Sequence, residues 1–193
     1  MPSLSPWLAD RVDAILLVVD VQERLAQAMP HRDTVVARIV TLVNAAKVLS
    51  VPVLVTRQNP SALGDTLPEI SAAVGPHEPI DKMTFCCRED PGFSDELALT
   101  WRGQVVLTGM ESHICIAQTA LALVEDGYRV HVVADATCSR HDEDAQVAFE
   151  RLRQAGIAVT TVEALLYELL GKAGTDEFRA VLDLVKALDA SAS

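Results

Sequence analysis

The chain has 193 residues, a length typical of one domain. Half of the residues are hydrophobic but only 4% are aromatic, so Val, Leu, Ile and Ala must fill the interior. That composition is typical of a sheet covered by helices on both faces. The 27 acidic residues exceed the 16 basic ones and give a net charge of −11, which disfavours nucleic acid and anionic lipid as partners. We expect a single domain over residues 1–193, with its core at about 14–188.

Apolar runs and cysteines indicate the compartment. The longest early apolar run, 14–19, ends at Asp20, has no basic flank and is too short to span a bilayer. The cysteines lack the paired C-x-x-C spacing of a zinc site; they are Cys86, Cys87, Cys115 and Cys138. We therefore expect a cytoplasmic protein with reduced thiols and no membrane partner.

Short runs rich in β-branched residues alternate with helical patterns along the chain. The runs predict buried strands at 15–19, 51–55, 105–108, 130–133 and 157–162. An apolar stripe over 35–46 predicts a helix that ends before Pro52, and two further helices are predicted at 114–125 and 142–155, capped by Gly127 and Gly156. The repeated strand–helix–strand order predicts a parallel sheet with right-handed crossovers.

Two regions break this alternation. The segment 57–79 contains six Pro and Gly residues and is expected to be a long loop, with one short strand near its end. At the C-terminus, apolar residues over 178–188 predict an amphipathic helix that must dock on the sheet or on another subunit.

Three residues are candidates for chemistry, because ligands of open parallel sheets bind beyond the carboxyl ends of the strands. Asp20 directly follows the first strand and could act as a general base, or merely cap a turn or helix. Cys115 follows a strand and a glycine turn, so a helix start could lower its pKa, or it could be a small core residue. Lys82, at the end of the long loop, could stabilise a thiolate and a carboxylate, or be a solvated lysine beside Asp81.

Other site types have weaker support. The five histidines show no metal-ligand spacing, and no glycine-rich phosphate loop follows any predicted strand. A dinucleotide-binding enzyme is therefore disfavoured, since its glycine fingerprint is missing after the first strand.

Taken together, the motifs resemble the isochorismatase-like hydrolases, also called cysteine hydrolases. The resemblance is carried in order by VVDVQ at 18–22, Lys82 before Phe85, and GMESHIC at 109–115 followed by DGY at 126–128. The branch of isochorismatase domain-containing proteins is further resembled by TRQNP at 56–60, LGDT at 63–66, PEI at 68–70, DATCSR at 135–140 and EALL at 163–166. The resemblance covers about 14–188.

The resemblance implies a Rossmann-like three-layer α/β/α fold with a six-stranded parallel sheet. It also implies a catalytic triad of Asp20, Lys82 and Cys115, in which Asp20 takes the thiol proton and Cys115 attacks a carbonyl carbon. Backbone amides near Glu111 and Cys115 would hold the oxyanion, and a cis peptide is implied between Met110 and Glu111. Three nearby residues are candidates for the substrate pocket: Gln22, Gln58 and Phe85.

Differences between this sequence and the family's motifs limit the kinds of reaction that the resemblance implies. Zinc-dependent relatives carry an Asp-x-His metal pair after the second strand, where this chain has RQNP at 57–60, so we expect no metal and no cofactor. Enzymes that act on isochorismate itself lack the nucleophilic cysteine. Cys115 therefore favours cleavage of a carbon–nitrogen bond in a small amide, carbamoyl or imide compound.

A rival interpretation is a non-catalytic binding or scaffold protein that has kept the fold, because fold alone does not establish activity. The expected partners are a small-molecule substrate and further copies of the chain, in a homo-oligomer that is a dimer or larger. The oligomer follows from the family and from the apolar face of the C-terminal helix.

Overall fold

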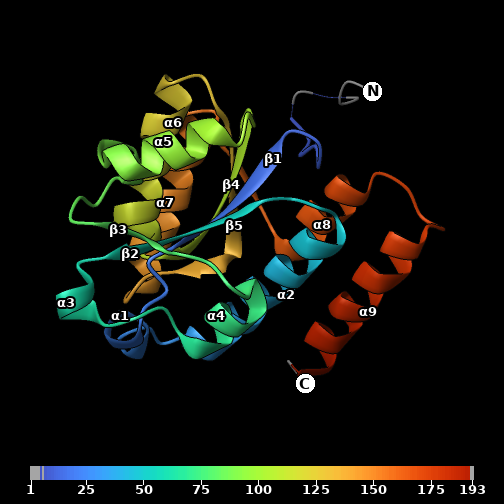
Figure 1. Ribbon diagram of the computed structural model, residues 1–193, viewed down its shortest axis with the longest axis horizontal. Coiled ribbons are helices and arrows are strands. Elements are labelled where there is room, and N and C mark those ends of the chain that lie inside the picture. The colour runs from blue at the N-terminus through green and yellow to red at the C-terminus, as the bar shows by residue number, and fades with distance from the viewer. Residues whose placement is uncertain (1–4, 6, 192–193) are drawn as a thin grey trace.

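The computed structural model describes residue 5 and residues 7–191. Its centre is a sheet of six parallel strands in the order β3-β2-β1-β4-β5-β6 (Figure 1). The strands are β1 (Ala14–Val19), β2 (Val53–Gln58), β3 (Ile80–Lys82), β4 (Gln104–Met110), β5 (Arg129–Cys138) and β6 (Ala158–Thr160). The expected α/β fold with a six-stranded parallel sheet is confirmed.

Helices cover both faces of this sheet. The described helical elements are α1 (Glu23–Gln27), α2 (Arg32–Val48), α3 (Pro60–Leu63), α4 (Pro68–Val74), η1 (Cys87–Glu89), α5 (Pro91–Leu99), η2 (Ser112–Ile116), α6 (Ala117–Glu125), α7 (Asp142–Gln154), α8 (Val162–Leu170) and α9 (Asp176–Ser191). One apolar core joins the sheet to α2, α4, α8 and α9, and a second joins it to α5, α6 and α7 (Figure 1). Among the described residues, no helix is both long and apolar enough to cross a membrane.

The chain reverses its direction of travel across the sheet between β1 and β4. From β1 it adds β2 and β3 on one side, and from β4 it adds β5 and β6 on the other. Val19 and Gly109 are paired near the carboxyl ends of the two central strands. Gly109 has φ +119°, and a Cβ on it would lie 2.0 Å from the Val19 carbonyl oxygen, so only glycine lets the strands approach this closely. The crevice for a ligand is therefore expected beside these two strand ends.

Some element boundaries differ from those predicted. The second strand begins at Val53 rather than at 51, because the Val51 N–H is used by the Ala46 carbonyl at the end of α2. The last strand is limited to Ala158–Thr160, since Thr161 is the N-cap of α8 and its side chain accepts from the Ala164 N–H.

Other differences concern whole segments. The segment 57–79 is less irregular than expected: it includes the end of β2, and both α3 and α4 begin with a proline in their first turn. The predicted helix 114–125 starts with a π-helical turn, η2, before α6. The C-terminal helix α9 packs against α2 and α8 of the same chain, with Val181 and Val185 buried. Its apolar face therefore gives no support to the expected oligomer.

Candidate active site

Asp20 lies at the reversal point of the sheet, immediately after β1, with φ +53°. Its side chain is fully buried. The Thr56 hydroxyl donates to Asp20 Oδ1 at 2.8 Å, and Lys82 Nζ donates to Oδ2 at 2.6 Å. The residue at the N-cap of α1 is Gln22, whose side chain makes no capping hydrogen bond. The capping alternative for Asp20 is therefore wrong, because one carboxylate oxygen accepts from Thr56 on β2 and the other from Lys82 on β3.

Lys82 ends the edge strand β3 and points inward. Its side chain is fully buried, and Nζ also donates to the Thr84 carbonyl at 3.1 Å. Burial acts to lower the pKa of Lys82, but the Asp20 carboxylate beside it outweighs burial and raises the pKa above its ordinary value. The alternative of a solvated loop lysine is wrong, since a buried ammonium has to be paired in this way.

Cys115 lies in the π-helical turn η2 and is 6% exposed. Burial and then the Asp20 carboxylate raise the pKa of this thiol above its ordinary range, while Lys82 acts to lower it. A hydrogen bond between Cys115 and Asp20 adds to the rise. The expected lowering of the pKa by a helix start is therefore wrong, because burial and a nearby negative charge outweigh it. The resting side chain is a protonated thiol beside a carboxylate.

A small cavity of about 70 Å³ opens on this group. Its lining residues are Asp20, Leu25, Gln58, Leu63, Phe85, Glu111, Ile114 and Cys115. Two of the three candidate pocket residues, Gln58 and Phe85, line it. Larger hollows exist, including one of about 390 Å³ against α2 and α9, but only the small one, among those described, borders both the carboxylate and the thiol.

Gln22 does not line this cavity, contrary to its expected role. Its side chain is fully buried, its Nε2 donates to the carbonyls of Gln58 and Gly64, and its Oε1 accepts from the Gln58 N–H at 2.7 Å. Backbone groups therefore use both ends of the amide. Gln22 holds the loop after β2 in place instead of facing a ligand.

The turn between β4 and η2 completes the site. Met110 is fully buried, and the peptide bond between Met110 and Glu111 is cis. Glu111 Oε2 accepts from the backbone N–H of Arg140 at 3.0 Å and from its Nε at 3.1 Å. The turn is thereby tied to the segment that follows β5.

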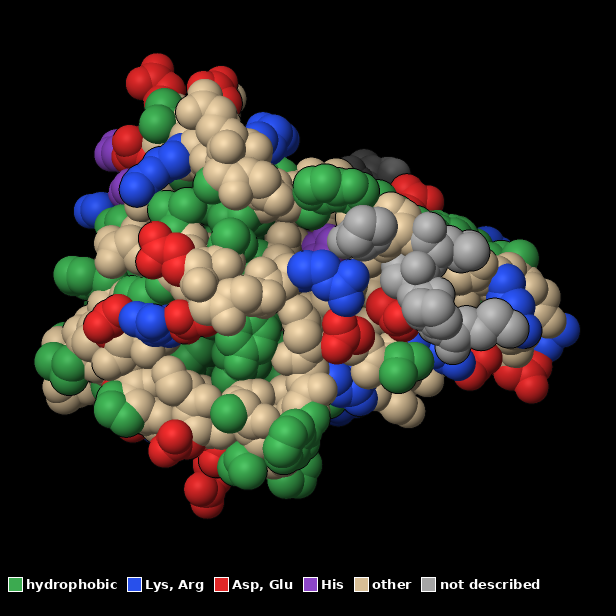
Figure 2. All heavy atoms as spheres, turned by 90° about the horizontal axis from the view of Figure 1, so that it is seen from above, with side chains coloured by type: hydrophobic (Ala, Val, Ile, Leu, Met, Phe, Trp, Pro, Cys, Tyr) green, Lys and Arg blue, Asp and Glu red, His purple; other side chains and the backbone are tan. Residues whose placement is uncertain are grey.

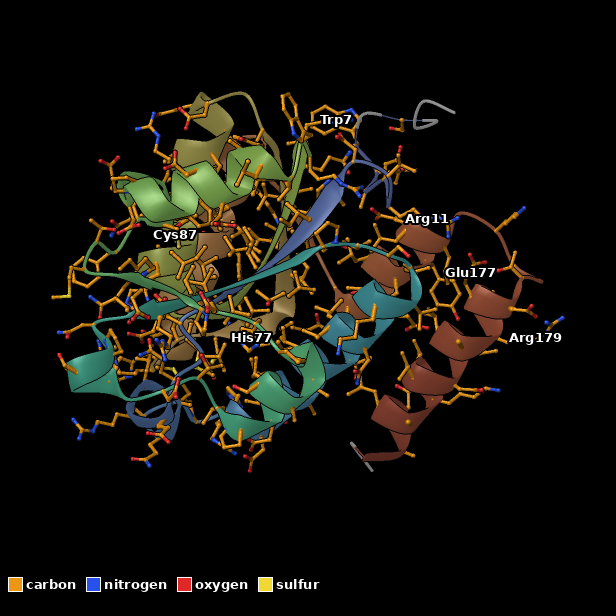
Figure 3. All side chains as sticks on the ribbon, in the orientation of Figure 1. Trp7, Arg11, His77, Cys87, Glu177 and Arg179 are labelled. Carbon is orange, nitrogen blue, oxygen red and sulfur yellow. The ribbon has the colours of Figure 1, made fainter. Side chains whose placement is uncertain are left out.

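Sequence reasoning assigned no role to two neighbours of this group, Thr56 and Cys87. Thr56 is paired with Val19 across the sheet, so a hydroxyl opposite the end of β1 was the available signal. Figure 3 places Cys87 among the side chains between α5 and the sheet, and its backbone N–H donates to Thr119 Oγ1 at 2.9 Å. Burial, followed by the Asp20 charge, raises the pKa of Cys87 to about 12.

Arg57, which lies in β2 at the start of the segment 57–60, forms ion pairs with two carboxylates. Arg57 Nε lies 2.7 Å from Asp81 Oδ1, and Arg57 Nη1 lies 2.6 Å from Asp65 Oδ1. Over the described part of the chain, no group of three or more His, Cys, Asp or Glu side chains is placed to hold a metal ion.

Comparison with known proteins identifies the family. Residues 14–164 match the isochorismatase domain model. The chain is 39% identical to the "secreted isochorismatase effector Isc1" of Phytophthora sojae over 178 residues, covering 90% of this chain and 84% of that protein. It is 37% identical to the bovine (Bos taurus) isochorismatase domain-containing protein 2, covering 90% and 83% of the two chains.

A solved structure agrees with this assignment. The structure of a protein named MAR1 ribonuclease, from Caenorhabditis elegans, superposes with a TM-score of 0.86 at 35% identity and covers 92% of each chain. The shared fold, the match over 14–164 and the sequence identity together show that this chain belongs to the isochorismatase family, alongside the isochorismatase domain-containing proteins.

Proposed function

We propose that the chain is a metal-independent cysteine hydrolase that cleaves a carbon–nitrogen bond of a small amide, carbamoyl or imide compound. Family membership supports a hydrolytic function. The observation that carries the finer proposal is the buried Asp20–Lys82 pair, with Nζ and Oδ2 2.6 Å apart, beside a thiol that borders the same cavity. Burying an ion pair is costly, so its position next to Cys115 favours a chemical role over a merely structural one.

The proposed reaction begins from the protonated thiol. As Cys115 Sγ attacks the substrate carbonyl carbon, Asp20 takes the thiol proton, and the carbonyl electrons move onto oxygen. When the tetrahedral intermediate collapses, the carbon–nitrogen bond breaks and the leaving nitrogen receives that proton. A water molecule then attacks the acyl-cysteine, Asp20 accepts its proton, and the acid is released as the thiol is restored.

Lys82 holds the Asp20 carboxylate in place and favours the thiolate that forms during attack. Backbone amides of the turn near Glu111 and Cys115 would stabilise the negative oxygen of the intermediate. Gln58 and Phe85 are proposed to contact the substrate, because both line the cavity.

Two competing functions are less well supported. A ribonuclease reaction is suggested by the names of three related solved structures, two of them called "putative", whereas the net charge of −11 opposes binding to phosphate backbones. Figure 2 shows Lys and Arg side chains beside Asp and Glu over the face in view, not gathered into one basic patch. The scaffold alternative predicts that the site residues can be replaced without loss of function.

We propose a single domain over residues 1–193, a cytoplasmic location and a homo-oligomer of two or more chains. Several large apolar side chains are exposed and available for such an assembly, including Trp7, Val12 and Trp101. Sedimentation velocity of the purified protein would test it, and a monomer at micromolar concentration would contradict it.

The experiment for the catalytic proposal uses a panel of small amides and ureas, with release of ammonia or amine as the readout. Cys115→Ser and Asp20→Asn should each lower turnover by at least about 10²-fold while leaving the fold intact. Cys86→Ser is the matched control, because Cys86 is a buried thiol outside the cavity. An acyl adduct on Cys115, trapped by acid quenching, should appear by mass spectrometry.

Normal turnover in both the Cys115→Ser and Asp20→Asn variants would overturn the proposed mechanism. Absence of turnover over the whole panel, with no adduct on Cys115, would favour the scaffold protein.

A further inference from the structure

The cavity beside Cys115 is narrow and mostly apolar away from the reacting groups. Its volume of about 70 Å³ is well below the 300–1,000 Å³ of ordinary ligand pockets. Leu25, Leu63, Phe85 and Ile114 form its apolar walls. Since one water molecule takes up about 30 Å³ of the liquid, the space suits a ligand of a few non-hydrogen atoms.

Three cations near the cavity are already paired with carboxylates, and Arg24, beside Leu25, donates to the Ala62 carbonyl. Lys82 Nζ lies 2.6 Å from Asp20 Oδ2, and Arg140 Nε lies 3.1 Å from Glu111 Oε2. Arg57, the residue before Gln58, is shared between two carboxylates. Strong recognition of a substrate carboxylate ordinarily uses a cation that is free to form paired hydrogen bonds.

The charged side chains that line the cavity are both acids. Asp20 and Glu111 border it, and its described lining contains no Lys, Arg or His. Both carboxylates are at least nine-tenths buried, so water screens their charges less than it would at the surface. An anionic group entering beside Cys115 would therefore meet the two carboxylates first, because Lys82 and Arg140, which pair with them, are not part of the lining.

We propose that the site selects uncharged amides with a short apolar substituent and discriminates against amides that carry a carboxylate. This inference rests on the proposed function and narrows its substrate class. The apolar walls hold the substituent, the thiol and Asp20 act on the carbonyl group, and the Glu111 carboxylate, which borders the cavity while Arg140 does not, repels acidic substrates.

The test uses two alkylating reagents of nearly equal size, iodoacetamide, which is neutral, and iodoacetate, which is an anion. The rate of each at Cys115 is followed by peptide mass spectrometry at fixed pH and salt. The ratio of the two rates is compared with the ratio for mercaptoethanol, a free uncharged thiol. We expect the preference for iodoacetamide at Cys115 to exceed that reference by at least about tenfold, because the two carboxylates border the cavity whereas the cations paired with them do not.

Matched variants identify the charge responsible. Glu111→Gln removes a cavity carboxylate and releases Arg140, so the preference should fall at least about threefold. Asp95→Asn changes the net charge by the same amount on the exposed surface of α5 and should leave the preference unchanged.

A pair of substrates tests the same selection during turnover. Butanamide should be hydrolysed with at least about tenfold higher kcat/KM than succinamate, which carries a terminal carboxylate in place of the methyl group.

The outcomes separate this inference from the proposed function. If the ratio of iodoacetamide to iodoacetate rates at Cys115 equals the ratio for mercaptoethanol, or favours iodoacetate, the proposed charge selection is overturned. The assignment of Cys115 as the nucleophile is not affected by that result. If neither reagent labels Cys115 before the other cysteines, the assignment of the nucleophile fails and the inference falls with it.

Discussion

Replacing Asp20 by Asn and Lys82 by Met should move the alkylation pKa of Cys115 in opposite directions. After burial, the Asp20 carboxylate is the main cause that raises the pKa of this thiol, and Lys82 lowers it. Asn preserves the shape of the aspartate without its charge, and Met preserves most of the length of the lysine. The two variants therefore change the charge around one thiol with little change in packing.

The size of the shift follows from the closeness of the three groups. At an effective dielectric constant of ~20, a unit charge ~4 Å away contributes about 4 kcal/mol, or about 3 pKa units. Lys82 and Asp20 lie 2.6 Å apart, so each removal also unmasks the charge of the other. The cavity admits water, which screens part of the field. We expect shifts of about one to two pKa units, downward for Asp20→Asn and upward for Lys82→Met.

The assay is the rate of iodoacetamide alkylation at Cys115 between about pH 6 and pH 11, resolved by peptide mass spectrometry. Below the pKa of the thiol, a shift of one pKa unit changes this rate about tenfold at any given pH, so the shift is measured without a complete titration. Lys82→Arg is the control, since it keeps the charge and should shift the pKa less than Met does. Because removing one partner of a buried ion pair costs about 3–5 kcal/mol, circular dichroism must first show that each variant folds. Superimposable profiles, or shifts in the same direction, would refute the electrostatic reasoning.

Three further predictions concern cysteine labelling, metal content and the pH dependence of folding stability. Under brief, limiting iodoacetamide at neutral pH, Cys115 should be labelled ahead of the other three cysteines despite its raised pKa, because it alone among them borders the cavity and Asp20 can take its proton as it attacks; faster labelling elsewhere would count against the site. Purified protein should contain no stoichiometric zinc by elemental analysis, and an activity lost to EDTA and restored by zinc would contradict metal independence. Burial, followed by Arg129, lowers the pKa of His131 to about 4. The unfolded chain, with a histidine pKa of about 6.5, therefore binds the proton more readily, and folding stability should be complete above that value and fall by about 3 kcal/mol as the pH drops to about 4. Urea unfolding should show this slope weakened in His131→Gln but retained in His141→Gln, a change at an exposed histidine; equal slopes would exclude His131 as the cause.

The strand cores were predictable because runs of β-branched residues indicate buried strands. The boundaries of the strands were not predictable where a neighbouring helix used the same backbone or side-chain group. Val51 reads as the start of a strand, yet its N–H closes α2, and Thr161 reads as a strand residue, yet it caps α8. Local sequence does not show which partner such a group takes, because the choice depends on tertiary packing.

The sequence was sufficient to predict which residues come together at the site. Asp20 and Cys115 follow the two central strands, so topology brings them together whatever the detailed packing. Side-chain direction was not predictable: Gln22 turns to the backbone of a loop, and Thr56 turns to the carboxylate. The pKa of Cys115 depended on burial and on the nearest charge, which exceeded the effect expected from its helical position.

Gly109 makes the distance between Asp20 and Cys115 depend on how closely the main chains of β1 and β4 approach. β1 delivers Asp20 one residue after Val19, and β4 leads within six residues to Cys115, so the missing side chain at Gly109 governs how near the two halves of the sheet can come. A methyl group on residue 109 would collide with the Val19 carbonyl oxygen and force β1 and β4 apart. Gly109→Ala should therefore diminish stability and turnover together. Substitutions of Asp20 or Cys115 should instead allow the effect on turnover to be separated from the effect on stability.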